Sequence, residues 1–265
     1  MNPSLAKIAA LLIDMDGVLW VGQKPLPGVN EFFAFMNARQ IRYVLVSNNA
    51  TRRAIYTVER MRDMGIPIAP EYILTSADAT PRWLTTKMPE IKRAFVVGEI
   101  ALQDALRDEH IEIVHENADA VVVGLDRHVN YEKLKRATLE IRRGAKFIAT
   151  NTDRTLPTEE GLTPGAGSLV AALIASTDVE PLVIGKPGRP MFDLALDIAG
   201  TNLQNTAMLG DRLDTDIDGA AEIGMQTIMV LTGVSTRAEA EQNKHKPTFI
   251  FDDLNALRQA WAQNT

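Results

Sequence analysis

Two aspartates separated by one residue follow a strongly apolar run near the start of the chain. The run Ile8–Ile13 predicts a buried strand, and Asp14 and Asp16 come directly after it. Carboxylates this close favour a hard divalent cation such as Mg²⁺. An ionised aspartate can act as a nucleophile and a protonated one as a general acid. Gly17 would allow close backbone approach to a ligand, although Asp and Gly are also common where a strand simply ends in a turn.

A second predicted strand, Tyr43–Val46, ends in a hydroxyl and an amide. Ser47 and Asn48 can both donate hydrogen bonds to phosphate oxygens. We expect Thr51 to cap a helix that begins just after them, and the free N–H groups of such a helix favour anions. The alternative is an ordinary helix cap with no ligand.

Two further predicted strands end in charged groups. Lys186 follows Leu182–Ile184 and could neutralise a nucleophilic carboxylate and a phosphate oxygen together. Asp211 follows Thr206–Leu209 and could share a magnesium ion with Asp14. Asp216 is expected in the first turn of the next helix. There it could hold a metal-bound water, support Lys186, or simply interact with the helix N-terminus.

Strands and amphipathic helices alternate along the chain, which predicts an α/β fold with a parallel sheet and helices on both faces. In such a sheet the ligand binds at the carboxyl edge of the strands, so the polar groups above are expected to converge there. The remaining predicted strands are Ile73–Leu74, Phe95–Val97, Ala120–Val123, Phe147–Ala149, Thr227–Leu231 and Thr248–Phe251. The predicted helices include Val29–Ala38, Ile100–Asp108, Tyr131–Arg143, Gly167–Ser176, Pro190–Ala199, Thr215–Ile223 and Asp253–Gln263. Ser76 is a possible helix cap. A polar loop is expected around Pro157, Gly161 and Pro164.

The middle of the chain is long enough to form a small α/β domain of its own. We expect residues 80–180 to be inserted between two parts of the sheet domain, residues 1–79 and 181–265. No internal repeat or low-complexity segment is visible.

Composition narrows the class of protein. The chain has 265 residues, 46% of them hydrophobic, and a net charge of −6, which argues against nucleic acid as a partner. It contains no cysteine, which excludes disulfides and thiolate metal sites, and its four histidines show no paired ligand spacing. The apolar run before Asp14 is too short for a signal peptide or a membrane span, so we expect no membrane partner and a cytoplasmic location.

Together these groups suit phosphoryl transfer through a covalent aspartyl-phosphate. Asp14 would attack phosphorus, while Mg²⁺, Lys186, Ser47 and Asn48 neutralise the transferring oxygens. Asp16 would protonate the leaving alcohol and then deprotonate the attacking water.

Four motifs occur in the order typical of the haloacid dehalogenase superfamily, and the chain resembles this superfamily throughout. Asp14–Leu19 resembles its first motif, DxDGVL, and Ser47–Asn49 its second. Lys186 resembles the third, and Gly210–Asp216 the fourth, GDxxxxD. The second aspartate of the first motif fits phosphatases rather than dehalogenases.

The long insertion is similar to that of the NagD-like, p-nitrophenyl phosphatase branch. The resemblance implies a Rossmann-like parallel-sheet core with an inserted smaller α/β cap domain, which acts as a lid and can mediate a homodimer. It implies a metal site of Asp14, Asp16 through its backbone carbonyl, and Asp211, with Arg212 and Asp214 near the substrate. Substrates of this branch include sugar phosphates, nucleotide monophosphates, phosphoglycolate and aryl phosphates. Two residues of the inserted domain are candidates for the leaving-group contact or, alternatively, for a simple Asx turn: Asn151 and Asp153.

Two other functions use similar residues. A phosphoaccepting signalling domain also combines acids, Mg²⁺, a hydroxyl and a Lys-Pro pair, but it is about half this length and its paired acids are adjacent. An inactive phosphometabolite-binding protein could use the same scaffold, although the complete motifs argue against it. Repeated release of phosphate would distinguish an enzyme from both.

Overall fold

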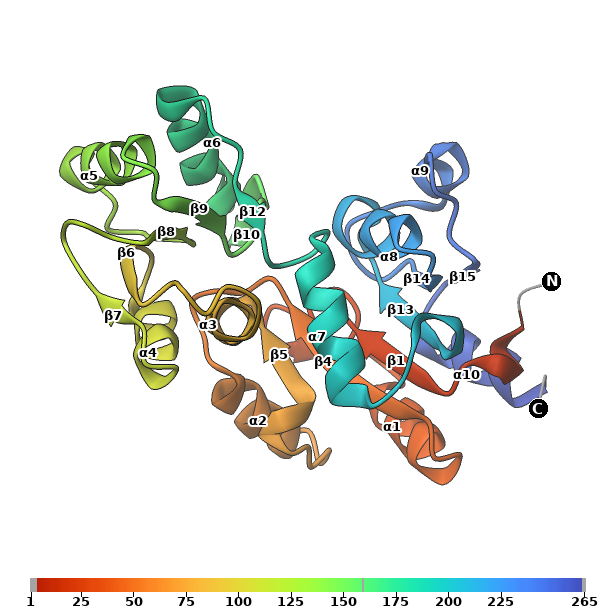
Figure 1. Ribbon diagram of the computed structural model, residues 1–265. Coiled ribbons are helices and arrows are strands. Elements are labelled where there is room, and N and C mark those ends of the chain that lie inside the picture. The colour runs from red at the N-terminus through yellow and green to blue at the C-terminus, as the bar shows by residue number, and fades with distance from the viewer. Residues whose placement is uncertain (1–3, 159, 264–265) are drawn as a thin grey trace. The chain divides into compact units, whose positions relative to one another are not determined.

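The alternating strands and helices form two parallel sheets in the computed structural model, which describes residues 4–158 and 160–263 (Figure 1). The six-stranded sheet has the order β15 (Phe249–Phe251), β14 (Gln226–Val230), β13 (Thr206–Gly210), β1 (Ala10–Ile13), β4 (Arg42–Ser47), β5 (Ile73–Thr75). The five-stranded sheet has the order β12 (Leu182–Val183), β9 (Lys146–Ala149), β8 (Ala120–Val123), β6 (Arg93–Val97), β7 (Glu112–Ile113). The predicted parallel α/β fold class is confirmed.

Most helices follow the predicted amphipathic segments, whereas the helix at Arg237–Gln242 was not predicted. Those of the first half are α1 (Val29–Ala38), α2 (Ala54–Asp63), α3 (Ser76–Lys87), α4 (Ile100–Asp108) and α5 (Tyr131–Arg142). Those of the second half are α6 (Ala166–Thr177), α7 (Arg189–Ala199), α8 (Asp218–Glu222), α9 (Arg237–Gln242) and α10 (Leu254–Gln263). Single helical turns lie at Leu5–Lys7, Pro70–Tyr72, Leu203–Asn205 and, in π form, Leu213–Ile217.

The chain divides into two compact units. One consists of Met1–Ser47, Ile55–Leu74 and Phe192–Thr265, and the other of Asn48–Ala54 and Thr75–Met191. These limits differ from the predicted domain boundaries. Compactness alone does not define a cap, so the inserted cap stays a prediction.

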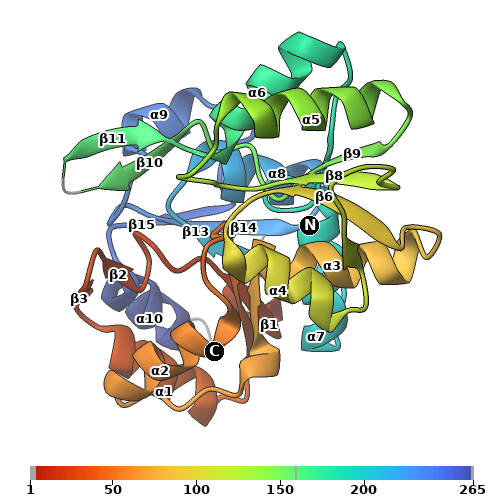
Figure 2. The ribbon, with the colours of Figure 1, turned by 90° about the vertical axis from the view of Figure 1, so that its left-hand side faces the viewer.

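The first unit is built around β1, whose four residues are fully buried. Complete burial of a central parallel strand requires helices on both faces of the sheet. Figure 2 shows α1 and α10 on one side of β1 and α7 on the other. The rings of Phe35 on α1 and Trp261 on α10 meet edge-on with centroids 6.1 Å apart. This contact joins the two helices on that side of β1.

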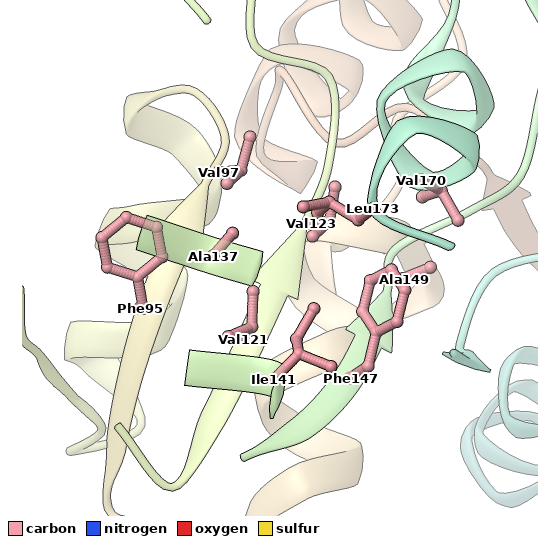
Figure 3. Close-up of a cluster of buried hydrophobic side chains, with 10 residues drawn as sticks. All are labelled: Phe95, Val97, Val121, Val123, Ala137, Ile141, Phe147, Ala149, Val170 and Leu173. Atoms are coloured by element: carbon pink, nitrogen blue, oxygen red, sulfur yellow. The ribbon is translucent and has the colours of Figure 1, made fainter. Parts of the chain in front are cut away.

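The second unit has its own hydrophobic core, between one face of its sheet and two helices (Figure 3). Alternate residues of β6, β8 and β9 share that face, as the two-residue period of a strand requires. They pack against α5 and α6, and the buried set is Phe95, Val97, Val121, Val123, Ala137, Ile141, Phe147, Ala149, Val170 and Leu173.

Several local predictions are wrong. The segment Leu182–Val183 pairs with β9 of the five-stranded sheet, so Lys186 does not follow a strand of the sheet that carries Asp14. A short apolar run specifies a strand but not the sheet that it joins. The predicted polar loop is a hairpin of β10 (Thr155–Thr158) and β11 (Gly161–Pro164). A second hairpin, β2 (Trp20–Val21) with β3 (Lys24–Pro25), was not predicted.

Two predicted helix caps are also wrong. Helix α2 begins at Ala54, too far from Thr51 for that side chain to cap it, and its Ala54 N–H donates to the Asp78 carboxylate at 3.0 Å. The cap of α3 is Thr75 rather than Ser76, and its hydroxyl accepts from the Asp78 N–H. The residues after Asn48 therefore do not begin a helix, which removes the predicted helix-end anion site.

Candidate active site

Three adjacent strands of the six-stranded sheet bring polar residues to one edge. The central strand β1 pairs in parallel with β13 on one side and β4 on the other. Asp14, Asp211 and Ser47 stand at the carboxyl ends of these three strands. Figure 1 labels the three strands, which lie side by side. Strand order reverses between β1 and β13, and this switch point is where open α/β sheets bind ligands.

Three carboxylates of this unit form a compact group. One oxygen each of Asp14, Asp211 and Asp216 lies within 4.8 Å of the others. Asp14 is 8% exposed, and the other two are completely buried. Clustered carboxylates in an apolar setting repel one another strongly, and a bound cation offsets that cost. Because all the donors are oxygens, the group fits a hard divalent cation.

Asp211 is held by the loop after β14 and by two glycines. Its Oδ2 accepts the Val234 N–H at 2.7 Å. A Cβ at Gly233 would lie 1.8 Å from Oδ2, and one at Gly17 would lie 2.5 Å from the same atom. Any larger residue at either position would therefore displace the carboxylate. Gly233 and Val234 were not predicted, and the only sequence signal is a glycine soon after a strand end.

Asp216 reaches the group through an irregular backbone turn. The π-helical turn Leu213–Ile217 replaces the start of the predicted helix. Such turns are rare and are frequent at functional sites. The Asp216 carboxylate accepts the Arg212 N–H at 3.1 Å and lies against the backbone of Gly210. Asp216 was predicted to act near the metal but was not among the three predicted ligands.

Asp16 has a different environment from Asp14. Its side chain is exposed and accepts a hydrogen bond from the Trp20 indole N–H, with Nε1 2.9 Å from Oδ1. The side chain is not one of the three clustered carboxylates. The metal role predicted for Asp16 uses its backbone carbonyl and stays a prediction.

The predicted phosphate-binding pair is divided at the boundary between the two units. Ser47 ends β4 and is 4% exposed. Asn48 belongs to the second unit, where its Nδ2 donates to the Lys186 carbonyl at 2.8 Å and to the Asp153 carboxylate at 3.1 Å. The Asn151 amide in turn donates to the Asn48 carbonyl at 2.7 Å. Asn48 is thus fixed in place by the segments that carry Lys186, Asn151 and Asp153.

Lys186 is 2% exposed and follows β12. The peptide bond that joins Lys186 to Pro187 is cis. Burying an ammonium group costs free energy unless the group is paired with an opposite charge. Its predicted convergence with Asp14 stays a prediction.

Asn151 and Asp153 form the Asx turn that was the alternative to a ligand role. The Asn151 Oδ1 accepts the Asp153 N–H at 3.1 Å. Their role in leaving-group contact stays a prediction.

Arg212 and Asp214, predicted to lie near the substrate, pair with each other. The guanidinium contacts both carboxylate oxygens, with Nε 3.1 Å from Oδ1 and Nη2 2.9 Å from Oδ2. Burial acts to raise the pKa of Asp214, but the hydrogen bond and charge of Arg212 outweigh it and lower that pKa below its ordinary value. Asp214 therefore carries a negative charge at neutral pH.

Comparison with known proteins places this geometry in a family. The family model for haloacid dehalogenase-like hydrolases matches residues 11–112, and a second HAD-hydrolase-like model matches residues 183–257. The acid sugar phosphatase of Staphylococcus epidermidis is 39% identical over 247 residues, 93% of this chain and 95% of that protein. The chain belongs to the haloacid dehalogenase-like hydrolase family.

Solved structures of family members agree with this assignment. The 4-nitrophenylphosphatase of Thermotoga maritima has a TM-score of 0.91 and 34% identity, covering 96% of this chain and 98% of that one. The glycerol phosphate phosphatase of Mycobacterium tuberculosis, solved with calcium, has a TM-score of 0.86 and 35% identity, covering 96% and 76%. The predicted family and the predicted enzyme class, a phosphatase, are confirmed.

Two further findings concern the metal and the membrane. The three clustered carboxylates indicate a divalent-cation site in this chain. The Mycobacterium tuberculosis glycerol phosphate phosphatase was solved in complex with calcium. Among the helices that the structure describes, none is long and apolar enough to cross a bilayer.

Proposed function

We propose that this phosphatase uses Mg²⁺ to hydrolyse small phosphomonoesters through an aspartyl-phosphate on Asp14. The observation that carries the proposal is the group of three buried carboxylates at the carboxyl edge of β1 and β13. A nucleophilic carboxylate and a cation site in one place are what phosphoryl transfer by this route requires.

The substrate class is inferred from the relatives. One is named an acid sugar phosphatase, another a 4-nitrophenylphosphatase and a third a glycerol phosphate phosphatase. We propose that the chain acts on sugar phosphates and other small phosphorylated metabolites, and on p-nitrophenyl phosphate as an artificial substrate. Nucleotide monophosphates and phosphoglycolate belong to the same proposed class.

The metal site is proposed from the donor set. The carboxylates of Asp14, Asp211 and Asp216 would hold Mg²⁺, with the Asp16 carbonyl as a further oxygen donor. The bound cation would neutralise negative charge on the transferring phosphoryl group. Magnesium rather than calcium is proposed because its compact octahedral site is the usual partner of phosphoryl transfer.

The chain's own groups carry the two chemical steps. In the first, a carboxylate oxygen of Asp14 attacks phosphorus, the ester P–O bond breaks, and Asp16 gives a proton to the leaving alcohol. In the second, Asp16 takes a proton from the attacking water, the bond from Asp14 to phosphorus breaks, and inorganic phosphate leaves. Ser47, Asn48 and Lys186 are proposed to hold the phosphoryl oxygens in both steps.

Replacing Asp14 with Asn tests the nucleophile. We expect a folded protein with at least about 10³-fold lower kcat, because the amide cannot form the intermediate. Asp252→Asn is a matched control, since the Asp252 side chain is 80% exposed and pairs only with Arg237 among the described residues. The assay measures repeated phosphate release from p-nitrophenyl phosphate and a panel of sugar phosphates with Mg²⁺. Substantial turnover by a folded Asp14→Asn protein would refute the proposal.

The resemblance alone supports a homodimer formed through the cap. A cytoplasmic location is proposed as the default expectation from the sequence. Sedimentation of the full chain tests the dimer, because a monomer at micromolar concentration would contradict it.

A further inference from the structure

The hairpin that follows Asp16 places a tryptophan against its side chain. Strand β2 begins at Trp20, which is 3% exposed, whereas Asp16 is exposed. The indole Nε1–H donates to Asp16 Oδ1 across 2.9 Å. The Gly17 N–H donates to the Trp20 carbonyl at 2.7 Å and closes the turn between them. A buried, rigid donor therefore fixes one oxygen of an exposed carboxylate.

Helix α2 contacts the face of the indole ring through Arg60. The Arg60 guanidinium lies over the Trp20 ring, 3.8 Å from the centroid. The same guanidinium donates from Nη2 to the Gly22 carbonyl at the tip of the hairpin, at 2.6 Å. Figure 2 shows α2 and the β2–β3 hairpin on the same side of the first unit. One cation thus fastens both the ring and the backbone of the hairpin to the helix.

In this hydrogen bond the indole is always the donor and the carboxyl group the acceptor. Indole N–H is a donor only, so it can bond to a carboxyl oxygen but cannot take the acid proton. The indole N–H therefore fixes Oδ1 as its acceptor. In the part of the chain that the structure describes, Oδ2 makes no hydrogen bond, which leaves it available for the reacting oxygen.

We propose that Trp20 is a positioning residue for acid–base catalysis, and that Arg60 keeps Trp20 in place. The inference rests on the proposed function, in which Asp16 is the acid and base. The proton passes from Asp16 Oδ2 to the ester oxygen as that oxygen's bond to phosphorus breaks and the bond from Asp14 forms. Holding the acid within hydrogen-bond reach is necessary for this transfer, because misplacement by about 1 Å can cost 10²-fold in rate.

Trp20→Phe removes the N–H and keeps a ring under Arg60. Trp83→Phe is the matched control, since the buried Trp83 Nε1 has no hydrogen-bond partner among the described residues and Lys87 lies over its ring. The assay measures kcat/KM with Mg²⁺ for phosphate esters whose leaving groups range from p-nitrophenol to a primary alcohol. Good leaving groups need little protonation, and poor ones depend on it.

We expect Trp20→Phe to lower kcat/KM about tenfold for the alkyl phosphate and less than about twofold for p-nitrophenyl phosphate. Trp83→Phe should change neither. Arg60→Gln should reproduce the same leaving-group dependence more weakly, and it provides a second route if Trp20→Phe does not fold. An equal loss for all esters in both variants would show a structural role only and would overturn the proposal.

A double-mutant cycle separates this inference from the function on which it rests. In an Asp16→Asn background, Trp20→Phe should cause no further loss of kcat/KM, because the group that it positions is gone. Independent effects of the two changes would overturn the inference while leaving the nucleophile intact. If Asp14→Asn instead retains turnover, the proposed function itself fails.

The contact can also be tested without turnover. The indole ¹H–¹⁵N resonance of Trp20 should move in Asp16→Ala, while that of Trp83 stays in place. An unmoved Trp20 resonance would show that the hydrogen bond does not form in solution, and the inference would fall.

Discussion

The close approach of Gly17 to Asp211 gives a test of how the cation site is built. Gly17 has φ of +86°, and a Cβ there would lie 2.5 Å from Oδ2 and 2.6 Å from Cγ of Asp211. Gly65 has a similar φ of +77° and nothing within 4 Å of its Cβ position. Both glycines have a positive φ of similar size, and they differ in what surrounds their Cβ positions. Alanine at each position therefore separates backbone strain from displacement of the carboxylate.

The expected losses of unfolding free energy follow from these two terms. Left-handed backbone costs an alanine about 1–2 kcal/mol, and this is the whole cost expected at Gly65. At Gly17 the methyl group must also displace Asp211, and overpacking of this kind costs about 1–3 kcal/mol more. Displacing one of three clustered carboxylates should further weaken divalent-cation binding by about 10- to 100-fold. Gly65→Ala should bind the cation as the natural protein does.

Two measurements check this prediction. Urea denaturation gives the unfolding free energies without added metal, and calorimetric titration with Mg²⁺ gives the affinities of the folded proteins. If Gly17→Ala binds Mg²⁺ as tightly as Gly65→Ala, Asp211 does not depend on the close approach and the reasoning is wrong.

Three further predictions concern acidity, a buried carboxylate and the metal. The Arg93 hydrogen bond lowers the pKa of Asp119, so this contact stabilises the fold above about pH 4 and is lost as pH falls through the lowered pKa. The melting temperature of Asp119→Asn should accordingly lie below that of the natural protein at pH 7, with a gap that narrows in acid. Glu140 is 1% exposed and pairs with Arg143 at 2.8 Å, so Glu140→Gln should cost about 1–3 kcal/mol of unfolding free energy in urea. Mg²⁺ at 100 times its Kd should stabilise the protein by about 2.7 kcal/mol; a chelator or Asp211→Asn should abolish this gain in thermal unfolding.

Helices and strands with strong periodicity could be predicted from the sequence. Helices α1 and α4 and strand β8 have the predicted bounds, because each is a continuous apolar or amphipathic segment between clear turn residues. The positions of Asp14 and Asp211 followed from the same reasoning. Each comes after an apolar run, and parallel strands end at one edge of their sheet.

The sheet that β12 joins could not be predicted. Its two residues pair with β9, although the chain has by then left the long insertion that was predicted to end at residue 180. Strand partners are chosen by tertiary packing, which a short apolar run does not record. The predicted helix caps were wrong for a related reason. The Ala54 N–H donates to Asp78, which lies 24 residues away in the sequence.

Irregular backbone was the other feature that could not be predicted from the sequence. An ordinary helix was predicted to begin at Thr215, whereas Leu213–Ile217 form a π-helical turn. In this turn Asp216 lies with the other two carboxylates. The hairpin that begins at Trp20 has strands of only two residues, too short for an alternating pattern. Both features lie next to the aspartates whose chemistry was predicted, and local propensity is least informative at such positions.

The unequal roles proposed for Asp14 and Asp16 have their origin in the turn between Met15 and Trp20. In a continued strand, residues two apart point to the same face, and both carboxylates would compete for one cation. Instead, the chain leaves the strand after Ile13, Gly17 adopts φ of +86°, and the Leu19 N–H bonds back to the Met15 carbonyl at 2.8 Å. Asp14 is left buried among the clustered carboxylates, whereas Asp16 is exposed with one oxygen bonded to an indole. A nucleophile must stay ionised near the cation, and an acid must exchange protons with solvent and substrate, so the turn supplies the two environments that the two steps need.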